Sequence, residues 1–150
     1  MSDRIVKTVE IDAPVSRVWQ AISDHEQFGQ WFRVKLDQPF TPGDVSTGKM
    51  TYPGFEGYPW LAQVVDVTRE QRLAFRWVHS EPRANAGIED LPTTLVEFLL
   101  EPVGPGTRLT IIESGFEAFP DPQRLEFLRR NTEGWNIQAN NVATYVASQS

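Results

Sequence analysis

The chain has 150 residues, a formal net charge of −6 and no cysteine, which fits one domain and excludes disulfide scaffolds, zinc fingers and thiolate-bound iron–sulfur clusters. The acidic balance argues against a general nucleic-acid binder, which carries a basic stripe. Hydrophobic residues make up 40% of the chain and aromatic residues 11%, so the chain is too apolar to be disordered. We therefore expect a single folded domain over residues 1–150, with no nucleic-acid partner.

The first third of the chain predicts one strand and two short helices. Residues 4–11 alternate apolar with polar side chains and are rich in β-branched residues, which is typical of a strand. Apolar residues at helical spacing then predict an amphipathic helix over 14–23, with Asp12 available to cap its first amides. A second short helix is predicted over 25–31.

From residue 34 to residue 116 the hydrophobic period changes to about two, and clusters of proline and glycine interrupt it. Gly104-Pro105-Gly106 is the strongest of these turn signals. The connection over 80–92 is long, and loops of this length are often binding or lid loops. The predicted strands cover residues 33–37, 44–52, 60–68, 72–79, 94–101 and 107–114.

The end of the chain predicts a long helix. Asp121 and Pro122 form a typical helix start, and apolar residues at spacings of three and four continue to about residue 148. Gly134 is expected to break or kink this helix. A curved antiparallel sheet of six to seven strands wrapped around the C-terminal helix buries both apolar faces, and we expect an internal cavity between them.

Several short motifs carry a resemblance to a known family. They are Ile11-Asp12-Ala13-Pro14…Val18-Trp19, Phe28…Trp31-Phe32, Arg72-Leu73…Phe75-Arg76-Trp77, Thr94-Leu95-Val96-Glu97-Phe98, Gly106-Thr107-Arg108-Leu109-Thr110…Glu113-Ser114-Gly115-Phe116 and Gly134-Trp135. With them, residues 4–148 resemble the helix-grip superfamily of START and Bet v-type lipid-binding domains (SRPBCC). Within it, the chain is similar to the single-domain bacterial form of the activator of heat-shock-protein-90 ATPase homologue-like family.

The resemblance implies an α+β helix-grip fold with an internal cavity. It is a poorer guide to activity, because the superfamily includes lipid carriers, cyclases, hydrolase-like members and stress proteins. Some bacterial relatives are described as oxidoreductase components of aromatic demethylases. That activity is excluded here, because the chain has no cysteine for a cluster and no nucleotide-binding GxGxxG motif.

Three functions follow as hypotheses. The leading one is non-covalent binding of a small hydrophobic or aromatic molecule in the cavity, without a cofactor or metal. The second is a cyclase or hydrolase-type enzyme. The third, implied by the family name, is a chaperone-associated or stress-response interaction module, and the family also implies a homodimer. Since no export signal or membrane-spanning segment is evident in the sequence, a cytoplasmic location is expected.

Two residues are candidates for catalysis. Strand alternation places Glu113 on the same face as Leu109 and Ile111, so it is expected to point inward. A carboxyl group in an apolar pocket could act as acid or base, and the alternatives are ligand contact or structural pairing. His79 ends its predicted strand, where its near-neutral pKa suits proton transfer, although a strand-end histidine is more often a surface residue. The spacing of the two histidines predicts no metal site.

Aromatic side chains are expected to line or gate the cavity, and the alternative is that they only fill the core. The predicted ligand-binding residues are Trp31, Phe32, Tyr52, Trp60, Phe75, Trp77, His79, Phe98, Glu113, Phe116 and Trp135. Further candidates for ligand contact are Phe55, Tyr58, Phe127, Asn131, Thr132, Gln138 and Tyr145.

Overall fold

The computed structural model describes residues 4–78, 88 and 91–148. Its strands form one antiparallel sheet in the order β1-β7-β6-β5-β4-β3-β2. In chain order the elements are β1 (Ile5–Ile11), α1 (Val15–Ser23), α2 (His25–Phe32), β2 (Val34–Leu36), β3 (Val45–Met50), β4 (Pro59–Thr68), β5 (Arg72–Val78), β6 (Thr93–Val103), β7 (Gly106–Ser114), η2 (Phe116–Ala118) and α3 (Asp121–Ser148). The predicted α+β helix-grip fold is confirmed.

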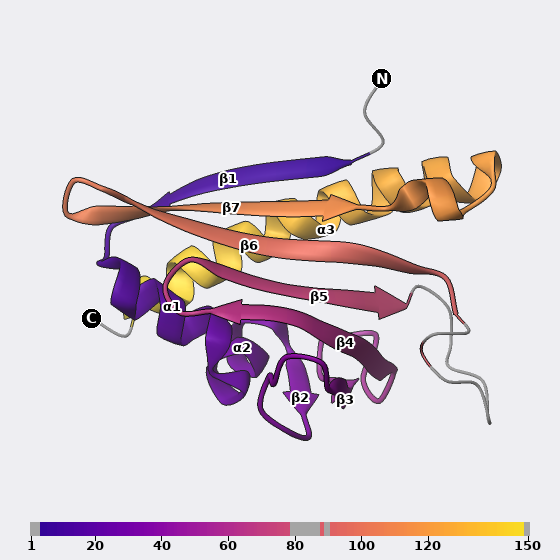
Figure 1. The fold of residues 1–150 in the computed structure, drawn as a ribbon, viewed down its shortest axis with the longest axis horizontal. Helices are drawn as coiled ribbons and strands as arrows, with labels where there is room; N and C mark the ends of the chain where they lie inside the picture. The colour runs from indigo at the N-terminus through magenta and orange to yellow at the C-terminus, as the bar shows by residue number, and fades with distance from the viewer. Residues whose placement is uncertain (1–3, 79–87, 89–90, 149–150) are drawn as a thin grey trace.

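The sheet and α3 form two layers. Figure 1 shows α3 running behind the sheet, with α1 and α2 beside its C-terminal half. The apolar stripe of α3 includes Trp135, Ala139, Val142 and Val146, which are all buried at spacings of four and three. These residues face the inner side chains of the strands, so the core lies between the helix and the sheet.

Two details of the helices differ from the sequence-based predictions. Asp12 does not cap α1, because Pro14 still has extended backbone angles and occupies the cap position without a side-chain hydrogen bond. The helix therefore begins at Val15, too far along the chain for Asp12 to reach its first amides. The expected break at Gly134 is also wrong, since α3 is continuous from Asp121 to Ser148. Within the described residues, no helix combines the length and apolar character needed to span a membrane.

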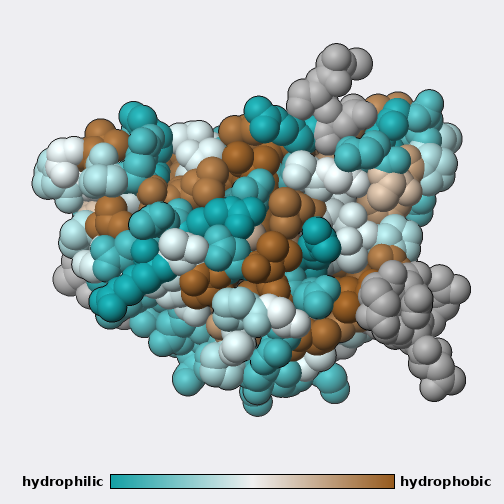
Figure 2. All heavy atoms as spheres, viewed as in Figure 1, coloured by the Kyte–Doolittle hydropathy of each residue, from teal (hydrophilic) through white to brown (hydrophobic). Residues whose placement is uncertain are grey.

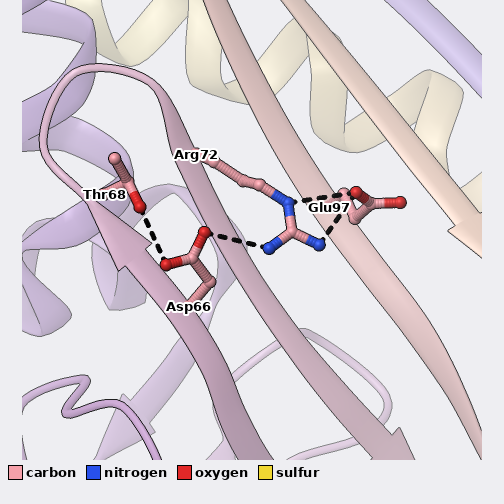
Figure 3. Close-up of polar contacts among 4 residues, drawn as sticks. All are labelled: Asp66, Thr68, Arg72 and Glu97. Carbon is pink, nitrogen blue, oxygen red and sulfur yellow. Dashed lines mark hydrogen bonds and ion pairs between the residues drawn. The ribbon is translucent and has the colours of Figure 1, made fainter.

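The outer face of the sheet carries hydrophilic and hydrophobic residues side by side (Figure 2). On this face Arg72 links three strands (Figure 3). Its Nη1 donates to Asp66 Oδ2 at 2.9 Å, and its Nη2 donates to Glu97 Oε2 at 3.0 Å. Thr68 Oγ1 donates to the second oxygen of Asp66 at 2.8 Å. The strand register shifts between Val64 and Asp66, so this network holds β4 against β5 next to an irregularity.

The network predicts a pH-dependent contribution to stability. Hydrogen bonds from Arg72, and then from Thr68, hold the pKa of Asp66 below its ordinary value of 3.8. The folded state thus favours the ionised carboxylate of Asp66. The carboxylate's contribution to the free energy of unfolding is present above the pKa of the unfolded state, and it is lost as the pH falls through the lower pKa of the folded state. We expect Asp66→Asn to lower the free energy of unfolding at neutral pH, and this difference to shrink below about pH 4.

Urea denaturation at neutral pH and at about pH 3 measures this difference. Asp44→Asn is the matched control, because Asp44 is an exposed aspartate outside the network. An Asp66→Asn deficit that is equally large at both pH values would contradict the proposed linkage.

Candidate functional site

Glu113 is fully buried on the inner face of β7, next to the last residue of that strand. It shares this face with Leu109 and Ile111, as the alternation of the strand predicts. A carboxyl group at 0% exposure is costly unless its oxygen atoms accept hydrogen bonds. The structure supplies such bonds from both layers of the fold.

Among the residues that the structure describes, four side chains donate to the carboxyl group of Glu113. Trp77 Nε1 donates to Oε2 at 2.8 Å, and Thr94 Oγ1 donates to the same oxygen at 2.5 Å. Trp135 Nε1 donates to Oε1 at 2.8 Å. Asn131 Nδ2 lies 3.0 Å from Oε1 and 3.2 Å from Oε2. We call this group of five side chains the Glu113 cluster.

The strand register and the helical repeat bring the Glu113 cluster together. Trp77 on β5 pairs with Thr94 on β6, which lies two residues from Val96, the partner of Glu113. Three neighbouring strands therefore present Glu113, Thr94 and Trp77 along one diagonal of the inner face. The other two donors come from α3, where a spacing of four residues places them on one side of the helix.

The indole rings of Trp77 and Trp135 stack on each other. Their centroids are 5.5 Å apart and their planes differ by 24°. Phe32 packs against both rings, with centroids 6.1 and 6.2 Å away, and Trp60 packs on Trp77 at 5.6 Å. Since both stacked indoles donate to Glu113, the carboxyl group fixes how the two rings are oriented.

A partly open cleft of about 510 Å³ lies beside these rings. Its walls are mainly apolar and come from the middle of α3, from β4 and β5, and from the segment between β3 and β4. Five of the predicted ligand-binding residues line it: Phe32, Tyr52, Trp60, Trp77 and Trp135.

Other predicted residues lie elsewhere. Trp31, Phe75, Phe98 and Phe116 are in the buried core, where their rings fill space instead of lining the cleft. Glu113 lies behind the cleft wall, where it holds two of the lining tryptophans. His79 is outside the residues that the structure describes.

The cleft also has lining residues that the sequence suggested less directly or not at all. Of the further candidates, Phe55, Tyr58, Asn131 and Gln138 line it, whereas Phe127, Thr132 and Tyr145 do not. The residues not predicted are Met50, Pro59, Leu61, Val78, Arg130, Gly134 and Ile137. A glycine inside a long helix, next to a tryptophan, is the sequence signal that could have located this surface.

Metal-ligating residues do not cluster in this region. In residues 4–78, 88 and 91–148, no group of three or more His, Asp or Glu side chains is arranged to hold a metal ion.

A comparison with family models agrees with the fold. The model described as "Activator of Hsp90 ATPase homolog 1-like protein" matches residues 12–147. The chain belongs to this family. Its members share the SRPBCC-type fold seen here, and the family resemblance predicted from the sequence motifs is confirmed.

Solved structures similar to this family member share its fold. Protein MLL2253 from Mesorhizobium loti has 20% sequence identity and a TM-score of 0.77, with 98% of each chain covered. DynU16, a protein from the dynemicin biosynthetic locus, has 23% identity and a TM-score of 0.75. That match covers all of this chain and 49% of DynU16, so this chain spans about half of its length.

A third similar structure is the Aha1 dimer from Colwellia psychrerythraea, with 17% identity, a TM-score of 0.70 and 95% of each chain covered. No curated protein matched this chain. At these identities the solved structures show the fold, and the function has to be argued from the site.

The Glu113 cluster predicts a strong effect of a conservative substitution. In Glu113→Gln the amide nitrogen replaces an oxygen that accepts hydrogen bonds, so buried donors lose their acceptor. We expect a loss of about 2–4 kcal/mol in the free energy of unfolding, measured by urea denaturation. The near-ultraviolet circular dichroism of the stacked tryptophans should change as well.

Ser114→Ala is the control, because Ser114 is the next residue on β7 and points to the opposite face. It should cost less than about 0.5 kcal/mol. A Glu113→Gln protein as stable as Ser114→Ala would show that the cluster does not hold the two layers together.

Proposed function

We propose that this protein binds a small aromatic or hydrophobic molecule, non-covalently, in the cleft between the sheet and α3. The observation that carries the proposal is the cleft of about 510 Å³ with the tryptophans of the Glu113 cluster in its wall. This volume lies within the usual range of ligand pockets, roughly 300–1,000 Å³, and such pockets are mostly lined by apolar and aromatic groups.

The orientation of the aromatic wall favours a planar ligand. Trp77 and Trp135 are held by hydrogen bonds to Glu113 and by their stacking on each other. A ring system that packs on them meets side chains that are already ordered, so little rotamer freedom is lost on binding. Aromatic pairs gain about 0.5–1.5 kcal/mol beyond the burial of their area.

The rim of the cleft is unusually apolar for a surface. Phe55, Tyr58 and Ile137 are 59%, 44% and 47% exposed, and all three line the cleft. Exposed apolar groups gathered around a hollow are typical of a binding site. A ligand that fills the cleft would cover part of this surface, which adds a hydrophobic contribution to the aromatic one.

Binding is favoured over the cyclase or hydrolase alternative. Both oxygens of Glu113 already accept hydrogen bonds, and the side chain has no exposed surface, so it is poorly placed to exchange a proton with a substrate. His79, the second residue of the enzyme hypothesis, lies outside the described residues. DynU16 comes from a biosynthetic locus, which is compatible with a small organic ligand.

The homodimer, the chaperone-associated role and the cytoplasmic location stay predictions from the family resemblance and the sequence. One similar structure, the Aha1 protein from Colwellia psychrerythraea, is a dimer. Light scattering on the purified chain measures its own oligomeric state directly.

The binding proposal predicts that a larger side chain at position 134 blocks the cleft. Apart from its chain neighbours and the backbone of its own helix, a Cβ atom added at Gly134 meets no atom of the described residues within 4 Å. Because Gly134 lines the cleft, a leucine side chain would extend into this space. Leucine also favours a helix more than glycine, so Gly134→Leu should remain folded. We expect the wild type to bind the neutral fluorophore N-phenyl-1-naphthylamine and Gly134→Leu to bind it at least about tenfold more weakly.

Probe fluorescence and quenching of the tryptophan emission measure this affinity. Asn136→Leu is the matched control, because it adds the same side chain to an exposed position of α3 outside the cleft lining. Failure of the wild type to bind the probe, or equal binding by Gly134→Leu, would refute the proposed site.

A further inference from the structure

Most polar groups in the lining of the cleft are already engaged within the protein. The amide of Asn131 donates to Glu113. Gln138 donates from Nε2 to the carbonyl oxygen of Phe32, and its Oε1 accepts from Asn141. The side chains of Asn131 and Gln138 are therefore less available to a ligand than the other polar side chains of the lining.

Arg130 is the charged side chain in the described lining of the cleft. Its guanidinium carbon lies 4.8 Å from the centroid of the Phe127 ring, which is a cation–π contact. Within the described part of the chain it pairs with no carboxylate, and its side chain is exposed. It stands four residues before Gly134, on the same side of α3 as the open space.

Three other arginines are paired with carboxylates. Arg72 and Arg108 each contact two carboxylates on the outer face of the sheet, and Arg124 pairs with Asp121 at the start of α3. In a chain with six more acidic than basic side chains, an arginine beside an apolar cleft without a carboxylate partner is a distinct feature. The phenol groups of Tyr52 and Tyr58, which also line the cleft, are further hydrogen-bond donors.

The lining thus offers a guanidinium group and phenol donors to a ligand. The buried carboxyl group of Glu113 lies behind the wall and accepts hydrogen bonds within the Glu113 cluster. We propose that the ligand is an aromatic acid, whose ring system packs on the tryptophans and whose anionic group pairs with Arg130. This inference rests on the proposed binding function and adds the ligand's charge to it.

The physical basis is the shape and position of the guanidinium. Its planar set of donors matches a carboxylate or a sulfonate, whose oxygens can accept two parallel hydrogen bonds. Contact with Phe127 restricts the side chain before binding, which reduces the entropy lost when the ion pair forms. The pair lies at the edge of an apolar wall, where charges interact more strongly than in open water but are still screened by salt.

Two fluorophores that differ by one charged group test the proposal. N-phenyl-1-naphthylamine is neutral, and 8-anilino-1-naphthalenesulfonate adds a sulfonate to the same rings. In Arg130→Gln we expect the affinity for the sulfonate to fall about three- to tenfold relative to the affinity for the neutral probe. Arg130→Lys, which keeps the charge but loses the planar donors, should fall between the wild type and Arg130→Gln.

Arg129→Gln is the matched control, because Arg129 is exposed, carries the same charge and is outside the cleft lining. It should leave both affinities unchanged, and added salt should weaken sulfonate binding in Arg129→Gln but much less in Arg130→Gln. An equal ratio of the two affinities in the wild type and in Arg130→Gln would overturn the inference.

The two proposals fail in different ways. If Gly134→Leu abolishes binding of the neutral probe while Arg130→Gln leaves the sulfonate probe unaffected, the cleft is a binding site but Arg130 does not select an acid. If Gly134→Leu affects neither probe, the binding function itself is refuted and the assignment of the ligand's charge falls with it.

Discussion

The buried carboxyl group of Glu113 is the constraint on which the arrangement of this protein depends. Its oxygens accept hydrogen bonds from Trp77, Thr94, Asn131 and Trp135, which belong to β5, β6 and α3. Leaving such a group unpaired in the core costs several kcal/mol, so the folded protein must place hydrogen-bond donors around both oxygens. That requires the correct register of three strands and the correct docking of the helix at the same time. The cluster therefore selects one arrangement of the two layers.

The same hydrogen bonds determine what the cleft can do. They orient the two stacked indoles, so the aromatic wall of the cleft is already ordered. They also engage both oxygens of this buried carboxyl group, which leaves it poorly suited to proton transfer. A carboxyl group that orients neighbouring side chains needs hydrogen-bond donors for both of its oxygens. A carboxyl group that transfers protons needs an oxygen that the substrate can reach. Glu113 has the surroundings of the first kind.

The sequence predicts the fold well because its strongest signals are local. Alternation in β7 places Glu113 inward beside Ile111, and the spacing of apolar residues in α3 identifies its buried stripe. The site is harder to predict, because alternation predicts the face of the strand on which a side chain lies but not whether that side chain is in the core or lines the cleft. Phe75 and Trp77 lie on the same face of β5, yet one is deep in the core and the other lines the cleft. Arg130 carries no sequence signal, since an exposed arginine on a polar helix has many ordinary explanations.

Gly134 supports the proposal that the cleft is a binding site. Other described glycines have a clear reason to be glycine: Gly115 has a positive φ of 97°, and a Cβ at Gly29 or Gly48 would lie 2.3 Å from a backbone oxygen. Among the described glycines, Gly134 alone lacks both reasons, because it is inside a continuous helix and faces open space. Glycine costs about 1 kcal/mol relative to alanine at such a position. A side chain there would stabilise the helix and fill the hollow, so the absent side chain is best explained by the space that it leaves beside Trp135.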